Sequence, residues 1–123
     1  MKYQKFEDLP IWKAARIFVK SIYQNCSSEK FNNDYALANQ LRRASTSVML
    51  NIAEGFERKS NKDFARFINN AKASAGEIRC ALYIGYDLNY LEKDEFDRLF
   101  EEIISISNQL FKFEQYLLST HKK

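Results

Sequence analysis

The last third of the chain carries the feature that most constrains its fold, an unbroken 3-4 alternation of apolar residues. An α-helix has about 3.6 residues per turn, so residues spaced in this way line one side of it. The apolar positions are Phe96, Leu99, Ile103, Ile106, Leu110, Phe113 and Leu117. This pattern predicts a long amphipathic helix over residues 93–119 that packs against other helices.

Three earlier segments have the same periodicity and predict helices over residues 9–24, 34–59 and 61–88. Their expected core stripes are Ile11, Ala15, Phe18 and Ile22; then Leu37, Leu41, Ala44, Val48 and Ile52; and then Phe64, Phe67, Ala71, Ala75, Ile78 and Leu82. Residues 25–33 are polar and are expected to form a turn. Four long helices with short connections predict an all-α protein, an up-down-up-down, left-handed four-helix bundle in a single domain over residues 1–123.

Helix ends are suggested by capping residues. We expect Asp8 to cap the first helix with Pro10 in its first turn, and Asn33 or Asp34 to cap the second. Ser60 and Asp63 resemble a capping box at the start of the third helix.

The composition narrows the possible classes of protein. Three glycines and one proline disfavour hairpins and glycine-rich phosphate loops. Gly55 and Gly85 fall on the core side of their helices, where close backbone approach would explain them. No signal peptide and no uncharged stretch of roughly 20 residues is visible, so we expect a cytoplasmic protein without a membrane partner. Cys26 and Cys80 lack metal-binding spacing and are expected to be free thiols.

A polar row flanks the second and third core stripes, about 60–120° around each helix. Such residues usually bridge neighbouring helices by hydrogen bonds, so we interpret the row as a structural seam; recognition of a ligand is the alternative. The row consists of Arg43, Ser47, Asn51, Glu54, Arg58, Asn70, Ser74 and Glu77.

The first and last helices carry more apolar surface than one bundle core needs. A helix that is apolar over a wide arc requires a second partner, so we expect self-association through these two helices. The interface candidates are Trp12, Val19, Tyr23, Phe100, Ile104, Phe111 and Leu118.

Charge is spread unevenly along the chain. Residues 1–88 carry 14 Lys and Arg against 9 Asp and Glu, a net +5, whereas residues 89–123 carry 5 against 7, a net −2. This excess weakly favours an anionic partner, RNA or DNA, and a scaffold that binds only protein is the competing class. The candidate nucleic-acid contacts are Lys13, Arg16, Lys20, Arg42, Lys62, Arg66, Lys72 and Arg79.

Catalysis is disfavoured because no complete catalytic constellation is present. The one histidine, His121, lies two residues from the end of the chain, and di-metal bundle enzymes need inward carboxylates with Glu-x-x-His pairs. Glu54 and Glu77 would form a buried carboxylate pair if their helices meet, but an arginine-neutralised structural pair is the favoured interpretation. We therefore expect no enzyme activity, no cofactor and no metal.

The polar row also carries a family resemblance. The run from Arg43 through Ser45, Ser47 and the Asn51–Gly55 segment (NIAEG) to Arg58 is similar to the signature of the 23S rRNA intervening-sequence protein family, also called four-helix bundle proteins. The similarity extends back to Phe6 and forward to Glu77, and it covers roughly residues 6–118. Departures are Pro10 in the entry to the first helix and Lys72-Ala73 before Ser74.

The resemblance implies a bacterial four-helix bundle that assembles into a homopentameric ring. A related branch, the accessory proteins of diversity-generating retroelements, binds nucleic acid and a reverse transcriptase through basic surface. The resemblance therefore adds a reverse transcriptase to the expected partners. Fold and ring follow more directly from the resemblance than function does.

Overall fold

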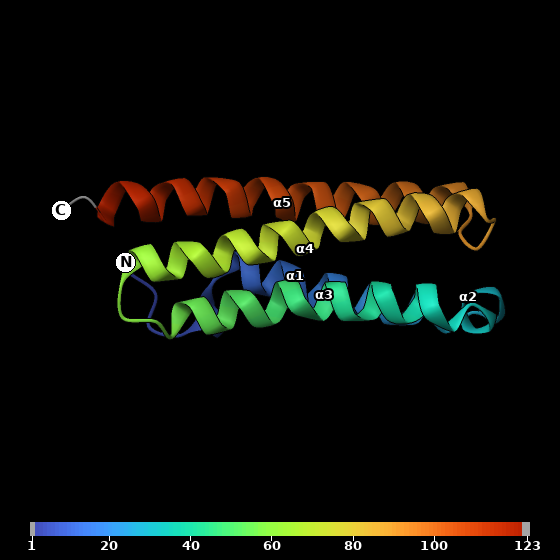
Figure 1. The fold of residues 1–123 in the computed structure, drawn as a ribbon, viewed down its shortest axis with the longest axis horizontal. Helices are drawn as coiled ribbons and strands as arrows, with labels where there is room; N and C mark the ends of the chain where they lie inside the picture. Colours follow the sequence, from blue (N-terminus) through green and yellow to red (C-terminus); the bar gives the residue numbers. More distant parts are fainter. Residues whose placement is uncertain (1, 122–123) are drawn as a thin grey trace.

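The computed structural model describes residues 2–121 and is helical throughout its ordered elements, with no strand in that range. Figure 1 shows the long helices side by side along the long axis of the molecule. The elements are the 3₁₀ turn η1 (Phe6–Asp8), α1 (Pro10–Cys26), α2 (Glu29–Asn33), α3 (Tyr35–Phe56), α4 (Asn61–Asp87) and α5 (Lys93–His121).

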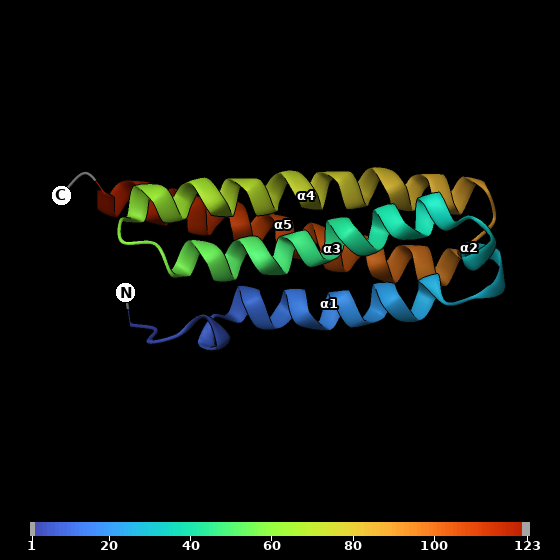
Figure 2. The ribbon, with the colours of Figure 1, turned by 60° about the horizontal axis from the view of Figure 1, so that its bottom comes forward.

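Each long helix has two neighbours. The helix α3 packs against α1 and α4, and α5 packs against α4 and α1. The helices α1 and α4 therefore lie at opposite corners of a helical bundle. Figure 2 shows α1 beside α3, with α5 behind them.

The predicted core stripes are confirmed, because every stripe residue of α1, α3 and α4 is buried. In α5, Phe96 and Phe113 are half-buried, and the other five residues of the stripe are buried. Three buried residues outside the long helices, Leu9, Phe31 and Leu91, extend the core at the two ends of the bundle. Apolar burial at about 25 cal/mol per Å² is the main term that holds the four helices together.

The helix ends follow the predicted caps only in part. Asp34 caps α3, since its Oδ1 accepts a hydrogen bond from the Leu37 N–H at 3.1 Å. The predicted cap of α1 was wrong: Asp8 lies in η1, and the N-cap is Leu9, which makes no side-chain cap bond because leucine has no polar side-chain atom. Pro10 lies in the first turn of α1, as predicted.

Two predicted boundaries also need correction. The second predicted helix ends at Phe56 rather than at residue 59, and the expected turn at 25–33 contains the short helix α2, whose N-cap Ser28 accepts from the Phe31 N–H. Ser60 accepts from the Asp63 N–H at 3.1 Å, which is half of a capping box. The Asp63 carboxylate turns to arginines instead of completing the box.

The glycines differ in their surroundings. A Cβ on Gly55 would lie 2.7 Å from Phe64 Cδ1 and 2.9 Å from Phe67 Cβ, and one on Gly85 would lie 3.0 Å from Phe31 Cζ. Close approach is therefore the reason for both, as predicted. A Cβ on Gly76 would meet no atom within 4 Å.

The two cysteines are free thiols, as expected, but their surroundings differ. Cys26 is buried between α1 and α3, where its Sγ lies 3.9 Å from the Ala38 carbonyl oxygen. Burial raises the pKa of the Cys26 thiol to about 11. Cys80 is exposed on α4.

None of the helices in the described part of the chain is both long and apolar enough to cross a membrane.

Candidate functional site

The middle of the predicted polar row forms a direct bridge between α3 and α4. Ser47 Oγ and the buried Ser74 Oγ are 2.9 Å apart and share a hydrogen bond. Asn51 Nδ2 donates to the Ser47 carbonyl oxygen at 2.8 Å and to Ser47 Oγ at 3.1 Å. The Ser47–Ser74 bond is the kind of contact between helices that the seam interpretation predicts. It lets the two helices approach closely over small residues without leaving polar groups unpaired.

Towards the start of α3, the seam opens into a polar hollow of about 400 Å³. Gln40 Nε2 donates across it to Glu77 Oε2 at 3.3 Å. Arg43 is exposed beside this bond. The lining residues are Ala36, Asn39, Gln40, Arg43, Ala44, Ser47 and Glu77.

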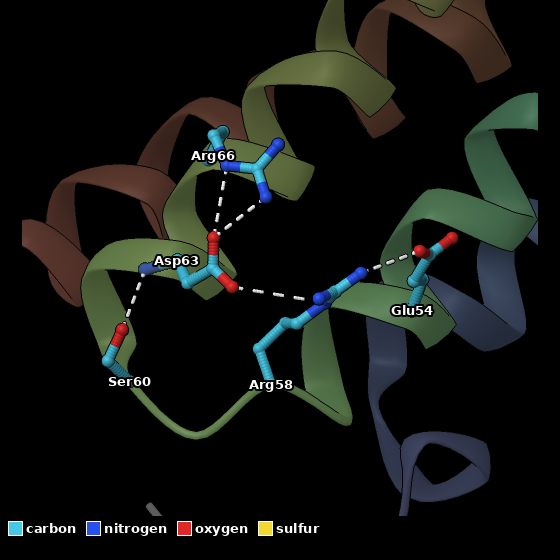
Figure 3. Close-up of polar contacts among 5 residues, drawn as sticks. All are labelled: Glu54, Arg58, Ser60, Asp63 and Arg66. Atoms are coloured by element: carbon cyan, nitrogen blue, oxygen red, sulfur yellow. Dashed lines mark hydrogen bonds and ion pairs between the residues drawn. The ribbon is translucent and has the colours of Figure 1, made fainter.

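At the other end of the seam, the α3–α4 turn holds a chain of ion pairs (Figure 3). Arg58 donates to Glu54 at 2.8 Å and lies 3.9 Å from the Asp63 carboxylate. Arg66 bonds the same carboxylate of Asp63 at 2.8 Å. Both guanidinium groups also lie over the Phe67 ring, 4.4 and 4.5 Å from its centroid. This arrangement covers an aromatic ring at the rim of the core and leaves neither arginine without a carboxylate.

One interpretation of the row was wrong. Glu54 and Glu77 do not form a buried pair: both are exposed, Glu54 pairs with Arg58, and Glu77 pairs with Gln40. Asn70 is exposed as well. The reason is that only the part of the row nearest the core stripe, Ser47 and Ser74, is close enough to the opposite helix to be covered.

The outer face of α1 carries the densest group of predicted nucleic-acid contacts. Lys13, Arg16 and Lys20 are all exposed. With Glu7, Trp12 and Ile17 they surround a surface hollow of about 480 Å³. The Arg16 guanidinium lies 5.8 Å from the Trp12 ring centroid. Three cations and one aromatic ring beside the same hollow make a surface suited to phosphate and base contacts.

The other five basic candidates are dispersed. Lys62 is exposed, Arg79 is half-buried, and Arg66 is held by Asp63. Arg42 lies over the Tyr23 and Tyr35 rings, at 6.0 and 5.9 Å.

Lys72, another of the candidate nucleic-acid contacts, is held by α5. It is half-buried and contacts Glu114 on α5 at 3.5 Å and the Phe111 ring at 5.0 Å. The structure therefore brings together the three residues of α1 but not all eight candidates.

The apolar interface candidates are uncovered to different degrees. Tyr23, Phe111 and Leu118 are exposed, at 47%, 49% and 38%. Trp12, Val19, Phe100 and Ile104 are half-buried. The Trp12 ring is partly covered because it packs edge-on against Phe6, with 5.1 Å between the ring centroids.

Sequence reasoning missed a group of aromatic side chains where α4 meets α5. Tyr83 and Tyr86 of α4 pack against Phe96 and Phe100 of α5, with ring centroids 4.8–5.5 Å apart. We call these four residues the α4–α5 aromatic cluster. Tyr83 and Tyr86 remain 52% and 37% exposed. The sequence does contain a signal for this cluster, because both tyrosines are large aromatic residues that lie off the core stripe of their helix.

Within residues 2–121 no group of three or more His, Cys, Asp or Glu is arranged to hold a metal ion. Burial raises the pKa of Glu102, and the nearby Arg98 guanidinium offsets part of this rise.

Comparison with known proteins agrees with the helical geometry and the polar row. A family model described as 23S rRNA-intervening sequence protein matches residues 7–112. The chain belongs to this family. A solved crystal structure from Bacteroides thetaiotaomicron, of a protein with unknown function from the S23 ribosomal protein family, is similar with a TM-score of 0.79. It is 20% identical, and the alignment covers 85% of this chain and 97% of that one.

The family assignment confirms the resemblance that the Asn51–Gly55 segment and its flanking residues carry. Because the identity is only 20%, the similarity to this crystal structure supports the fold and nothing further. No curated protein matches the chain.

Proposed function

We propose that this member of the family is a non-enzymatic, oligomeric, up-down-up-down left-handed four-helix bundle of the cytoplasm that binds nucleic acid electrostatically. Its assembly is a homopentameric ring, and its contact surface is the outer face of α1. The observation that carries the proposal is the group of three exposed cations on one face of α1, Lys13, Arg16 and Lys20.

The physical argument is counterion release. Lys and Arg contacts to phosphates displace condensed cations, so binding strengthens at low salt and requires no base-reading element. One chain has a formal charge of +3, and five copies in a ring would carry five such charges and five α1 faces. Repetition of a weak contact raises the overall affinity without any new contact.

The test is a mobility-shift titration with single-stranded RNA, structured RNA and duplex DNA at two salt concentrations. We expect binding without sequence preference whose affinity falls by orders of magnitude between ~50 and ~200 mM salt if six or more phosphates are engaged. The triple variant Lys13→Glu, Arg16→Glu and Lys20→Glu should lose nucleic-acid binding.

A matched control carries the same change of charge elsewhere, at Lys30, Arg98 and Lys112, which lie outside the α1 face. It should retain most of the affinity. Equal losses in the two triple variants would mean that only net charge matters. No shift at low salt with any of the three nucleic acids would leave a protein scaffold as the function.

The scaffold alternative is favoured by one specific observation, the exposed apolar side chains outside the core. Ile17, Tyr35 and Leu50 are exposed by 64–66%. Several exposed apolar side chains on one protein are typical of surfaces that bind other chains.

A further inference from the structure

The C-terminal end of α4 gathers uncovered apolar side chains more densely than any other stretch in residues 2–121. Four of the eleven large apolar side chains that are exposed there fall within six residues, Tyr83, Ile84, Tyr86 and Leu88. Two of them, Tyr83 and Tyr86, belong to the α4–α5 aromatic cluster. This surface is separate from the basic face of α1, because α1 and α4 lie at opposite corners of the bundle.

The cluster is held in a fixed arrangement. Tyr83 packs against Phe96 and Phe100 with centroids 5.5 and 5.2 Å apart, and Tyr86 packs against Phe96 at 4.8 Å. Phe96 and Phe100 are stacked one turn apart on α5, at 5.3 Å. Rings fixed in this way lose little conformational entropy when a partner covers them, so they are efficient contact groups.

The sequence segment that carries the cluster is acidic. Residues 79–102 carry three basic and seven acidic side chains, whereas residues 1–78 carry a net +5. Asp87 follows Tyr86 on α4, and Asp97 and Glu101 flank Phe100 along α5. Lys93 Nζ lies 2.7 Å from Asp97 Oδ2, so one cation of the chain is already bound at this rim. Such a surface repels phosphate and attracts a cation.

We propose that the α4–α5 aromatic cluster, with its rim of Asp87, Asp97 and Glu101, binds an arginine-rich segment of a partner protein. A guanidinium group stacks on an aromatic face and at the same time donates paired hydrogen bonds to a carboxylate. Lysine stacks on an aromatic face less well, and it cannot donate paired hydrogen bonds to a carboxylate. This binding is additional to the proposed nucleic-acid contact and does not depend on it.

The test is fluorescence anisotropy of the full chain with a labelled nine-residue oligoarginine peptide and, separately, oligolysine of equal length. We expect oligoarginine to bind several-fold more tightly than oligolysine. The double variant Tyr83→Ala with Tyr86→Ala should weaken oligoarginine binding about tenfold, at about threefold per exposed ring. Tyr35→Ala with Tyr116→Ala removes two exposed tyrosines elsewhere and should change it by less than about twofold.

A second pair of variants tests the rim. Asp87→Asn with Glu101→Gln should weaken oligoarginine binding more than Glu29→Gln with Glu57→Gln, which removes the same charge from exposed positions of other elements. Helical circular dichroism and melting temperature of every variant establish that it is folded. Similar losses in the cluster and control variants, or equal affinity for the two peptides, would overturn the proposal.

Two further outcomes would overturn it in favour of another occupant. If the Tyr83 and Tyr86 variant changes the molecular mass in solution, the cluster is a contact between copies of this chain. If it instead loses affinity for single-stranded RNA, the rings stack on bases. Failure of the α1 triple variant to affect RNA binding would concern only the proposed function, since that variant leaves this surface unchanged.

Discussion

Gly55 and Gly76 lie in the interior of long helices but have opposite surroundings. A methyl group at Gly55 would press on Phe64 Cδ1 at 2.7 Å and on Phe67 Cβ at 2.9 Å, whereas one at Gly76 would meet open space. We expect Gly55→Ala to destabilise the fold by about 1–3 kcal/mol through overpacking. We expect Gly76→Ala to stabilise it by about 0.5–1 kcal/mol, because alanine loses less backbone entropy in a helix.

Urea denaturation followed by circular dichroism measures both changes at one protein concentration. The two variants control for each other, since each adds a single methyl group to a long helix. A loss of stability in Gly76→Ala comparable to that in Gly55→Ala would contradict the open space found beside Gly76.

At this scale the sequence predicts side-chain roles where the local pattern alone decides them. Asp34 and Ser60 cap their helices because a cap needs only its own first turn. Asp63 could not be placed in the same way, because two arginines, Arg58 and Arg66, compete for its carboxylate and one of them comes from the preceding turn.

The helices α3 and α4 are joined by the Ser47–Ser74 hydrogen bond, and this contact can be measured. A double-mutant cycle with Ser47→Ala and Ser74→Ala should give a coupling of about 0.5–1.5 kcal/mol, the usual net value of one hydrogen bond. Asn51→Leu should be destabilising by a similar amount, because Asn51 donates to Ser47 twice.

Glu54→Gln is the matched change outside the bridge, and it should cost less than about 0.5 kcal/mol, because the Glu54–Arg58 pair is exposed on both sides. Chemical denaturation of the single and double variants gives the comparison. Additive effects of the two serine changes would mean that the bond contributes nothing to the packing of α3 on α4.

Element by element, periodicity predicted the core face of all four long helices, because a buried stripe must repeat with the helical turn. It could not predict α2. That helix has five residues and buries only Phe31, so it contains no repeat to detect. Nor could periodicity show how far a flanking polar residue lies from the next helix, which is why Ser74 is buried and Asn70 is exposed.

At the scale of the whole molecule, we expect the chain to form a homopentamer, and a measurement of mass in solution tests this. Light scattering of a homopentamer should give five times the 14.5 kDa of one chain. Phe111→Glu should shift the mass towards the monomer, because it places a carboxylate at an apolar contact. Phe111 is better suited to this test than Trp12, whose ring packs on Phe6 within its own chain.

Gln115→Glu, one turn along α5 at another exposed position, adds the same charge and should leave the mass unchanged. A monodisperse monomer for the unmodified chain would contradict the oligomer altogether.

For the molecule as a whole, the sequence indicated that α1 and α5 have surplus apolar residues, but not which of them stay uncovered. Trp12 is partly covered by Phe6, while Ile17, outside the predicted interface, is 64% exposed. Such differences depend on how neighbouring elements lie against a helix, and single-helix periodicity contains no information on that.

The contrast between Cys26 and Cys80 allows local opening of the fold to be measured from the reactivity of its native thiols. Thiolate is the reactive form, and Cys26 is both buried and, with a pKa of about 11, protonated at pH 8. We expect iodoacetamide at pH 8 to modify Cys80 rapidly and Cys26 only when α1 separates from α3. The delay of the second mass increase then measures the free energy of that local opening, without any engineered probe.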